Sequence, residues 1–131
     1  MRVLVLEDSP ERIREFKRNL IGCNVDITKN PNEAMQFLKE KSYDYIFLDC
    51  DLEENHYFPS YWTDKMITES KTTGVAVARF LEENPDLSKS ATVVVHSLNP
   101  VGSKSMMKFC EPRGARYIPY YQLWDVVKVS R

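Results

Sequence analysis

Short apolar runs alternate along this chain with stretches whose apolar residues recur at helical spacing, and this alternation constrains the fold more than any other feature. Runs of about four residues are too short for helices and are typical of strands covered on both faces. We expect strands at 3–6, 25–28, 45–48, 92–95 and 116–118. Strands separated by helices in this way form right-handed β-α-β units, so a parallel sheet is predicted.

The expected helices share a start signal. A serine or asparagine that can cap a helix precedes a proline at 9–10, 30–31 and 99–100, and proline is favoured at the first helical position. Further helices are expected at 74–83 and 122–129, the latter with Leu123, Val126 and Val127 facing the core. The sequence therefore predicts one α/β domain over residues 1–131. Its sheet would be doubly wound and flavodoxin-like, with five parallel strands in the order 2-1-3-4-5 and helices on both faces.

A long connection interrupts this pattern after the third expected strand. Residues 53–73 contain no convincing element, although 64–69 could form one helical turn. Its aromatic residues are Tyr57, Phe58, Tyr61 and Trp62. A connection of about twenty residues inside a compact domain is often a binding loop. These aromatic side chains would then either contact a substrate or pack the insertion against the domain.

The composition excludes several classes of function. The chain has 18 Lys and Arg against 19 Asp and Glu, a net charge of −1, so it is not expected to bind DNA by bulk charge. Its 3 cysteines fit neither a disulfide framework nor a zinc site, which favours a reducing, cytoplasmic location. No apolar run approaches the ~20 residues of a membrane span, so no membrane partner is expected.

Acidic and polar side chains follow three of the expected strands. These strand-end residues are Glu7 and Asp8, Asp49 and Asp51, and His96 and Ser97. Ligands of open parallel sheets bind at the carboxyl ends of the strands, so we expect these side chains to share one edge. Crowded carboxylates repel one another, and a divalent cation removes that conflict. Because oxygen ligands suit Mg²⁺ or Mn²⁺ better than Zn²⁺, the four carboxylates predict a magnesium or manganese site.

An anion site is expected beside the metal site. Asn99 precedes the helix that begins at Pro100, and the free N–H groups and dipole of a helix start attract anions. The backbone N–H groups of Asn99, Gly102 and Ser103 are therefore predicted to bind a phosphate. A metal ion beside an anion indicates phosphoryl chemistry, and it explains why an apolar strand runs directly into Asp49.

Each of these residues also has a structural interpretation. Asp8 could cap the first helix, and Asp51 could be a turn residue that contacts a metal only through its backbone. His96 follows an apolar strand and could be a buried, hydrogen-bonded structural residue. Asn99 is first of all a helix cap. The sequence leaves these alternatives open.

The strand-end residues resemble those of response-regulator receiver domains, over nearly the whole chain apart from the insertion. The residues that carry the resemblance are Glu7-Asp8, Asp49, Ser97 and Gly114-Ala115. The resemblance implies that Asp8 and Asp49 hold magnesium, with Glu7 assisting. It also implies that Asp49 accepts a phosphoryl group and that Ser97 binds a phosphoryl oxygen. The lysine that the family carries at the end of the fifth strand is missing, since residues 117–121 contain none.

The chain is similar, more specifically, to a divergent receiver branch assigned to cyclic-phosphate processing and RNA repair. This likeness is carried by Glu7-Asp8, Asp49-x-Asp51 and His96-Ser97-x-Asn99-Pro100-x-Gly102. It implies that Asp49 or a water molecule attacks a phosphate while Asp51 or His96 protonates the leaving oxygen. Ser97 and the N–H groups after Asn99 would hold the non-bridging oxygens. The expected partner is then a phosphate-containing small molecule or an RNA end.

Three functions remain open on this basis. The first is a metal-dependent phosphoesterase. The second is a signalling receiver that accepts phosphate on Asp49 and changes its affinity for a protein partner. The third is a pseudo-receiver that keeps the fold and only mediates interactions. The missing lysine counts against the second function, and the acidic strand ends with His96-Ser97 count against the third.

Overall fold

One parallel sheet, in the order β2-β1-β3-β4-β5, forms the centre of the computed structural model, which describes residues 1–52 and 61–129. The strands are β1 (Arg2–Leu6), β2 (Asn24–Thr28), β3 (Tyr45–Leu48), β4 (Thr92–Val95) and β5 (Arg116–Tyr117). Leu6 of β1 is level with Leu48 of β3, and Leu48 is level with Val95 of β4. The predicted strand order and direction are confirmed, and the three central strands end at the same edge.

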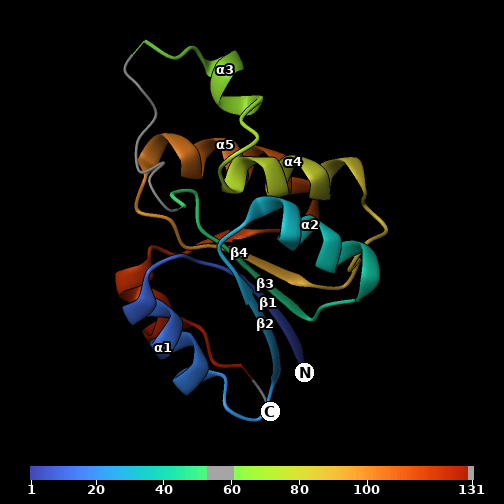
Figure 1. The fold of residues 1–131 in the computed structure, drawn as a ribbon, viewed down its shortest axis with the longest axis vertical. Helices are drawn as coiled ribbons and strands as arrows, with labels where there is room; N and C mark the ends of the chain where they lie inside the picture. The colour runs from blue at the N-terminus through green and yellow to red at the C-terminus, as the bar shows by residue number, and fades with distance from the viewer. Residues whose placement is uncertain (53–60, 130–131) are drawn as a thin grey trace.

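Helices cover both faces of this sheet. They are α1 (Pro10–Asn19), α2 (Pro31–Glu40), α3 (Asp64–Thr68), α4 (Gly74–Glu83), α5 (Pro100–Cys110) and α6 (Leu123–Val126), with 3₁₀ turns η1 (Glu111–Arg113) and η2 (Tyr120–Gln122). Figure 1 shows α2, α4 and α5 on one face, and α1 with the C-terminal segment on the other. The fold is therefore the doubly wound α/β arrangement that the sequence predicts.

Each face of the sheet carries its own apolar cluster. Alternate residues of a strand point to opposite faces: Leu4 and Leu6 of β1 pack toward α2, α4 and α5, whereas Val3 and Val5 pack toward α1 and α6. All four side chains are fully buried. Because both faces are covered, the central strands are apolar throughout.

The repeated start signal of the helices is confirmed. The Ser9 hydroxyl accepts a hydrogen bond from the backbone N–H of Arg12 at 3.4 Å, and the Asn99 side chain accepts one from Gly102 at 3.0 Å. Asn30 caps α2 in the same way, by accepting from two backbone N–H groups of its first turn. Proline occupies the first position of all three helices.

The C-terminal segment differs from the prediction. A continuous helix over 122–129 was expected, but α6 ends at Val126 because the backbone becomes extended at Val127 (φ −88°, ψ 122°). The side chain of Val127 is buried while that of Val126 is exposed, so the prediction that Val126 faces the core is wrong. Strand β5 ends at Tyr117, one residue before the predicted end, although the N–H of Ile118 still donates to Val95 at 2.9 Å.

Helix α3 lies inside the expected insertion and confirms the helical turn predicted at 64–69. Tyr61 is 75% exposed and does not pack against the domain, while Trp62 is half-buried. Tyr57 and Phe58 lie outside the described residues, so the role of the inserted aromatic side chains stays a prediction. Within the part of the chain that the structure describes, no helix is long and apolar enough to span a membrane.

Candidate functional site

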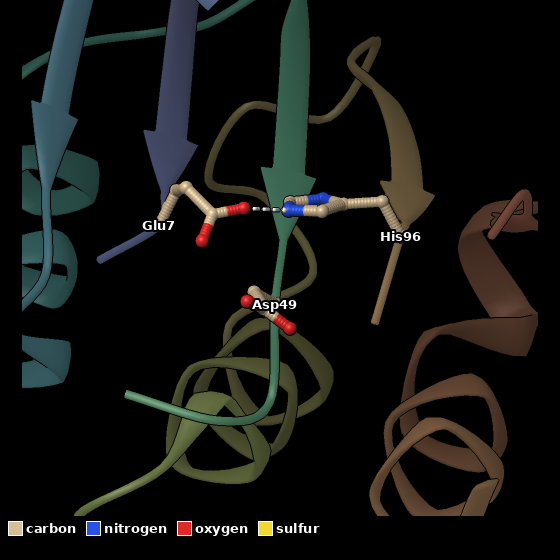
Figure 2. Close-up of side chains that lie close together, drawn as sticks. All are labelled: Glu7, Asp49 and His96. Carbon is tan, nitrogen blue, oxygen red and sulfur yellow. Dashed lines mark hydrogen bonds and ion pairs between the residues drawn. The ribbon is translucent and has the colours of Figure 1, made fainter. Parts of the chain in front are cut away.

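The register of the three central strands brings Glu7, Asp49 and His96 together, because each of them directly follows its strand. Backbone bonds extend the ladder by one step: the N–H of Asp49 donates to Leu6 at 3.2 Å, and that of His96 donates to Leu48 at 3.0 Å. One ligand atom from each of the three side chains lies within 4.8 Å of the others. Figure 2 shows the group, with Glu7 and His96 pointing toward each other above Asp49.

Glu7 is fully buried, and its side chain is hydrogen-bonded to His96 and to the backbone between β1 and α1. Its Oε1 lies 3.0 Å from Nε2 of His96, while Oε2 accepts the backbone N–H groups of Asp8 at 3.0 Å and Ser9 at 3.2 Å. Burial by itself would raise the pKa of Glu7. The hydrogen bond and electrostatic attraction of His96, the Ser9 N–H and the Arg12 guanidinium outweigh burial and hold this pKa below its ordinary value. Glu7 is therefore a fixed, ionised acceptor.

Asp49 is 4% exposed, and among the described residues a backbone N–H bonds to only one of its two side-chain oxygens. Its Oδ1 accepts the N–H of Cys50 at 2.8 Å, whereas Oδ2 lies 3.8 Å from the guanidinium of Arg12. Burial is the largest cause that raises the pKa of Asp49 to about 7; His96 opposes it, the carboxylate of Glu7 adds to it, and Arg12 opposes it. Asp49 is thus a carboxyl group whose ionised form is poorly stabilised by the protein itself.

His96 lies behind Glu7 and not on the surface of the site. Its side chain is fully buried, and its ring is in edge contact with Phe16 and Tyr120, with ring centres at 5.4 and 6.0 Å. Among the described residues Nδ1 has no hydrogen-bond partner. His96 therefore reaches the site through Glu7, as the structural interpretation of this residue expected. Its predicted role as a proton donor stays a prediction.

An open cleft of about 310 Å³ lies over this group. It is lined by Glu7, Asp8, Ser9, Arg12, Asp49, Asp51 and Leu98. The predicted ligands Asp8 and Asp51 thus lie at the same cleft as Asp49. Asp51 is held by Asn99, whose side-chain amide donates to its Oδ1 at 2.9 Å. The acidic residues that the sequence indicated therefore meet at one edge of the sheet.

The residues predicted to bind phosphate form the start of α5. The N–H of Asn99 donates to the hydroxyl of Ser97 at 3.1 Å, that of Gly102 donates to the Asn99 side chain, and that of Ser103 donates to the Asn99 carbonyl. Ser97 is fully buried, and its carbonyl accepts from the hydroxyl of Tyr117 at 3.1 Å. These N–H groups are engaged within the chain, so a phosphate could bind them only after those bonds open. The phosphate assignment stays a prediction.

Close packing explains why position 102 is a glycine. A Cβ at this position would lie 2.2 Å from the sulfur of Cys50. The absence of a side chain therefore lets α5 approach the segment between Asp49 and Asp51.

Asn99 links the cap of α5 to the cleft, and its substitution separates these two contributions. We expect Asn99→Ala to lower the free energy of unfolding by about 1–2 kcal/mol, because both the cap and the bond to Asp51 are lost. Asn99→Ser retains a capping oxygen but cannot reach Asp51, so it should cost about half as much. Chemical unfolding of the two variants measures this difference. Equal losses would show that the cap contributes nothing.

The group formed by Glu7, Asp49 and His96 fits a divalent cation. Two buried carboxylates lie together, and the raised pKa of Asp49 reports the unfavourable crowding that a cation would relieve. The predicted ligand set contained oxygen atoms only, and the imidazole of His96 lies beside it, bonded to Glu7 at 3.0 Å. Carboxylate oxygens suit both Mg²⁺ and Mn²⁺. Direct ligation by Asp8 and Asp51 stays a prediction.

Sequence reasoning missed Arg12. Its guanidinium lies 3.7 Å from Oε1 of Glu7 and 3.8 Å from Oδ2 of Asp49, inside the cleft. Along the sequence it is one of several basic residues of α1, together with Arg14, Lys17 and Arg18. Its position three residues after the cap Ser9, at the end of the helix that faces the strand ends, is the signal that could have singled it out.

Comparison with known proteins agrees with this geometry. A family model described as the cyclic-phosphate processing receiver domain matches residues 2–112. The match includes every described residue that lines the cleft, and the chain belongs to this family of receiver domains. The segment after η1 lies outside the match. No curated protein matches the chain at a significant level.

Solved receiver structures show the same fold. The response regulator TrrA from Thermotoga maritima, in complex with Mg²⁺ and BeF, has a TM-score of 0.61 at 20% identity, over 90% of this chain and 84% of that one. A CheY-like receiver domain protein from Methanospirillum hungatei has a TM-score of 0.61 at 17% identity, over 90% and 79% of the two chains. A sensor protein from Polaromonas has a TM-score of 0.62 at 18% identity, over 93% and 84%. Identities this low relate the folds alone.

Proposed function

We propose that this protein is a divalent-metal-dependent phosphoesterase that opens cyclic phosphates of nucleotides or of RNA ends. The observation that carries the proposal is the buried pair Glu7 and Asp49 at the floor of an open acidic cleft. Membership of the cyclic-phosphate processing receiver family supports the substrate class. Metal dependence is supported by the raised pKa of Asp49, because the residues around Asp49 do not stabilise its ionised form and a bound cation would.

A cation held by Glu7 and Asp49, with His96 supporting Glu7 from behind, would neutralise carboxylate charge and polarise a bound phosphate. Glu7 is fixed by His96 and by two backbone N–H groups, so it would hold its position without reorganisation. Asp49 lines the cleft and keeps Oδ1 on the N–H of Cys50, so Oδ2 would serve as the metal ligand or as the nucleophile.

Ring opening needs a proton on the leaving oxygen, and Asp51 suits this role better than His96. Asp51 lines the cleft and is oriented by Asn99, whereas His96 is fully buried behind Glu7. In the hydrolysis, one P–O ester bond breaks and one forms to a water oxygen. If Asp49 attacks first, a water molecule then cleaves the bond between Asp49 and phosphorus and releases the phosphomonoester. The leaving oxygen takes the proton that Asp51 supplies, and Asp51 recovers it from the attacking water.

The second candidate is a receiver that only accepts a phosphoryl group on Asp49. The receiver fold and the position of Asp49 in the lining of the cleft favour it. Residues 117–121 contain no lysine at the end of β5 to balance an aspartyl phosphate, which disfavours it.

One experiment separates the candidates. The chain is incubated with Mn²⁺ or Mg²⁺ and with a 2′,3′-cyclic nucleotide, a 3′,5′-cyclic nucleotide or an RNA that ends in a cyclic phosphate, and phosphorus NMR follows ring opening. A parallel reaction with a small phosphodonor is analysed for an acid-labile adduct. We expect a phosphomonoester to form only when the metal ion is present, and a chelator should abolish its formation. An adduct without ring opening would replace the proposal with the receiver function. If neither product forms, the protein would be an interaction module.

A further inference from the structure

The cleft presents an electrostatic problem to any phosphate. Four of the residues that line it are acidic, namely Glu7, Asp8, Asp49 and Asp51. A phosphate that enters would be repelled by them even after one divalent cation has bound. Among the described residues that line the cleft, Arg12 is the only cation.

The position of Arg12 fits an oxyanion ligand better than a saturated ion pair. Its guanidinium lies 3.7 and 3.8 Å from the carboxylates of Glu7 and Asp49, beyond the roughly 2.7–2.9 Å of a charge-assisted hydrogen bond. Among the described residues, no oxygen accepts a hydrogen bond from this side chain. The guanidinium thus lines the cleft with ion pairs that are too long to be hydrogen bonds, and it carries its donors in a fork that matches two phosphate oxygens.

The C-terminal segment holds Arg12 in place. The guanidinium carbon lies 4.5 Å from the ring centre of Tyr120, which gives a cation–π contact. The hydroxyl of Tyr120 donates to Glu15 at 2.7 Å and accepts from the indole N–H of Trp124 at 3.3 Å. Tyr120 is thereby fixed from both sides, so the long Arg12 side chain loses little further entropy when it binds a ligand.

We infer that Arg12 is a phosphate-binding residue, which pairs with a non-bridging phosphoryl oxygen at the cleft. This inference rests on the proposed function for the presence of a phosphoryl group beside Asp49. Arg12 neutralises the transferred or hydrolysed phosphate from the α1 side, and the metal site neutralises it from the strand ends. The alternative is that Arg12 serves only as an internal counter-ion for Glu7 and Asp49.

The two roles predict opposite effects on metal binding and on phosphate binding. A counter-ion repels a divalent cation, so its removal tightens metal binding and leaves phosphate binding alone. If Arg12 binds phosphate, it acts once the metal is bound, so removing the Arg12 side chain weakens phosphate binding. The test therefore measures Mn²⁺ affinity first, and then the affinity for inorganic phosphate at saturating Mn²⁺, both by titration calorimetry on the full chain.

We expect Arg12→Gln to weaken phosphate binding by at least about tenfold, the effect of losing a hydrogen bond to a charged group. Its Mn²⁺ affinity should be unchanged or higher. Arg12→Lys keeps the charge but loses the fork and the stacking, so it should bind phosphate with intermediate affinity. The control Arg14→Gln removes the same charge from an exposed position of α1 and should match the unmodified protein.

Phosphate binding that is the same in Arg12→Gln and the unmodified protein would overturn the inference, as would an unmodified, Mn²⁺-loaded protein that binds no phosphate. Circular dichroism of each variant verifies that it is folded. If phosphate binding depends on Arg12 but no cyclic phosphate is opened, the inference stands and the proposed function fails. If ring opening occurs and phosphate affinity does not depend on Arg12, the proposed function stands and the inference fails.

Discussion

Asp49→Asn should remove metal binding and ring opening while making the metal-free protein more stable at pH 8. Asparagine preserves the shape of the side chain and the acceptor for the N–H of Cys50. It removes the negative charge that a cation needs. Mn²⁺ affinity should therefore fall on the order of a hundredfold or more, because residues that only hydrogen-bond to a metal ligand already change metal affinity by up to about a hundredfold. Calorimetry with Mn²⁺ measures the loss.

The stability effect follows from the raised pKa of Asp49. Its folded value of about 7 lies above the unfolded value of about 3.9, so the folded state binds more protons between these two pH values. The metal-free protein therefore loses stability as pH rises from about 4 to about 7. The amide of the Asp49→Asn variant does not titrate, so this variant should be more stable by about 1–3 kcal/mol at pH 8 and equal to the unmodified protein near pH 4.

Chemical unfolding of the metal-free proteins at several pH values tests this prediction. The groups that face Asp49 and set its titration are Glu7, Arg12 and His96. Asp86→Asn, which removes an exposed carboxylate in the turn after α4, is the matched control and should show no such pH dependence. A stability difference for Asp49→Asn that stays constant between pH 4 and 8 would refute the explanation.

Gly74→Ala should destabilise the protein by about 3 kcal/mol or more, as overpacking against a rigid neighbour does. A Cβ at Gly74 would lie 1.9 Å from the carbonyl oxygen of Asp49 and 3.0 Å from the sulfur of Met106. The first of these atoms is backbone and cannot rotate away. The N–H of Gly74 also donates to the carbonyl of Cys50 at 3.1 Å, so α4 cannot move outward without losing this bond.

Gly114→Ala is the control for this substitution. Gly114 has a positive φ of 70°, yet a Cβ there would have open space around it. The cost should be only the strain of a left-handed backbone, about 1 kcal/mol. Urea unfolding of both variants measures the difference. A cost for Gly74→Ala no greater than that for Gly114→Ala would mean that α4 does not pack against the end of β3 as closely as the structure has it.

Much of the fold could be predicted because its signals are local. The apolar runs predicted the five strands, and the capping residues Ser9, Asn30 and Asn99 marked three helix starts that the structure confirms. The end of α6 could not be predicted in this way. Val126 and Val127 are identical in type, and tertiary packing alone buries the second and exposes the first.

The same division holds within the site. The strand-end position of Glu7, Asp49 and His96 could be predicted, and parallel strands made their proximity an expectation. The pairing of Glu7 with His96 could not be predicted, because it depends on rotamers and on a register between residues far apart in sequence. The nearness of Arg12 depends on how α1 packs and on a tyrosine more than a hundred residues away.

The sequence by itself determined which residues end each strand, and hence that acidic groups gather at one edge of a parallel sheet, because strand periodicity and helix capping are properties of neighbouring residues. Only the tertiary structure decided which carboxylate is buried with which partner, that His96 stands behind Glu7, and that Arg12 faces Asp49. These contacts depend on packing between elements that are distant in sequence, and a local sequence pattern does not predict the distances between such elements.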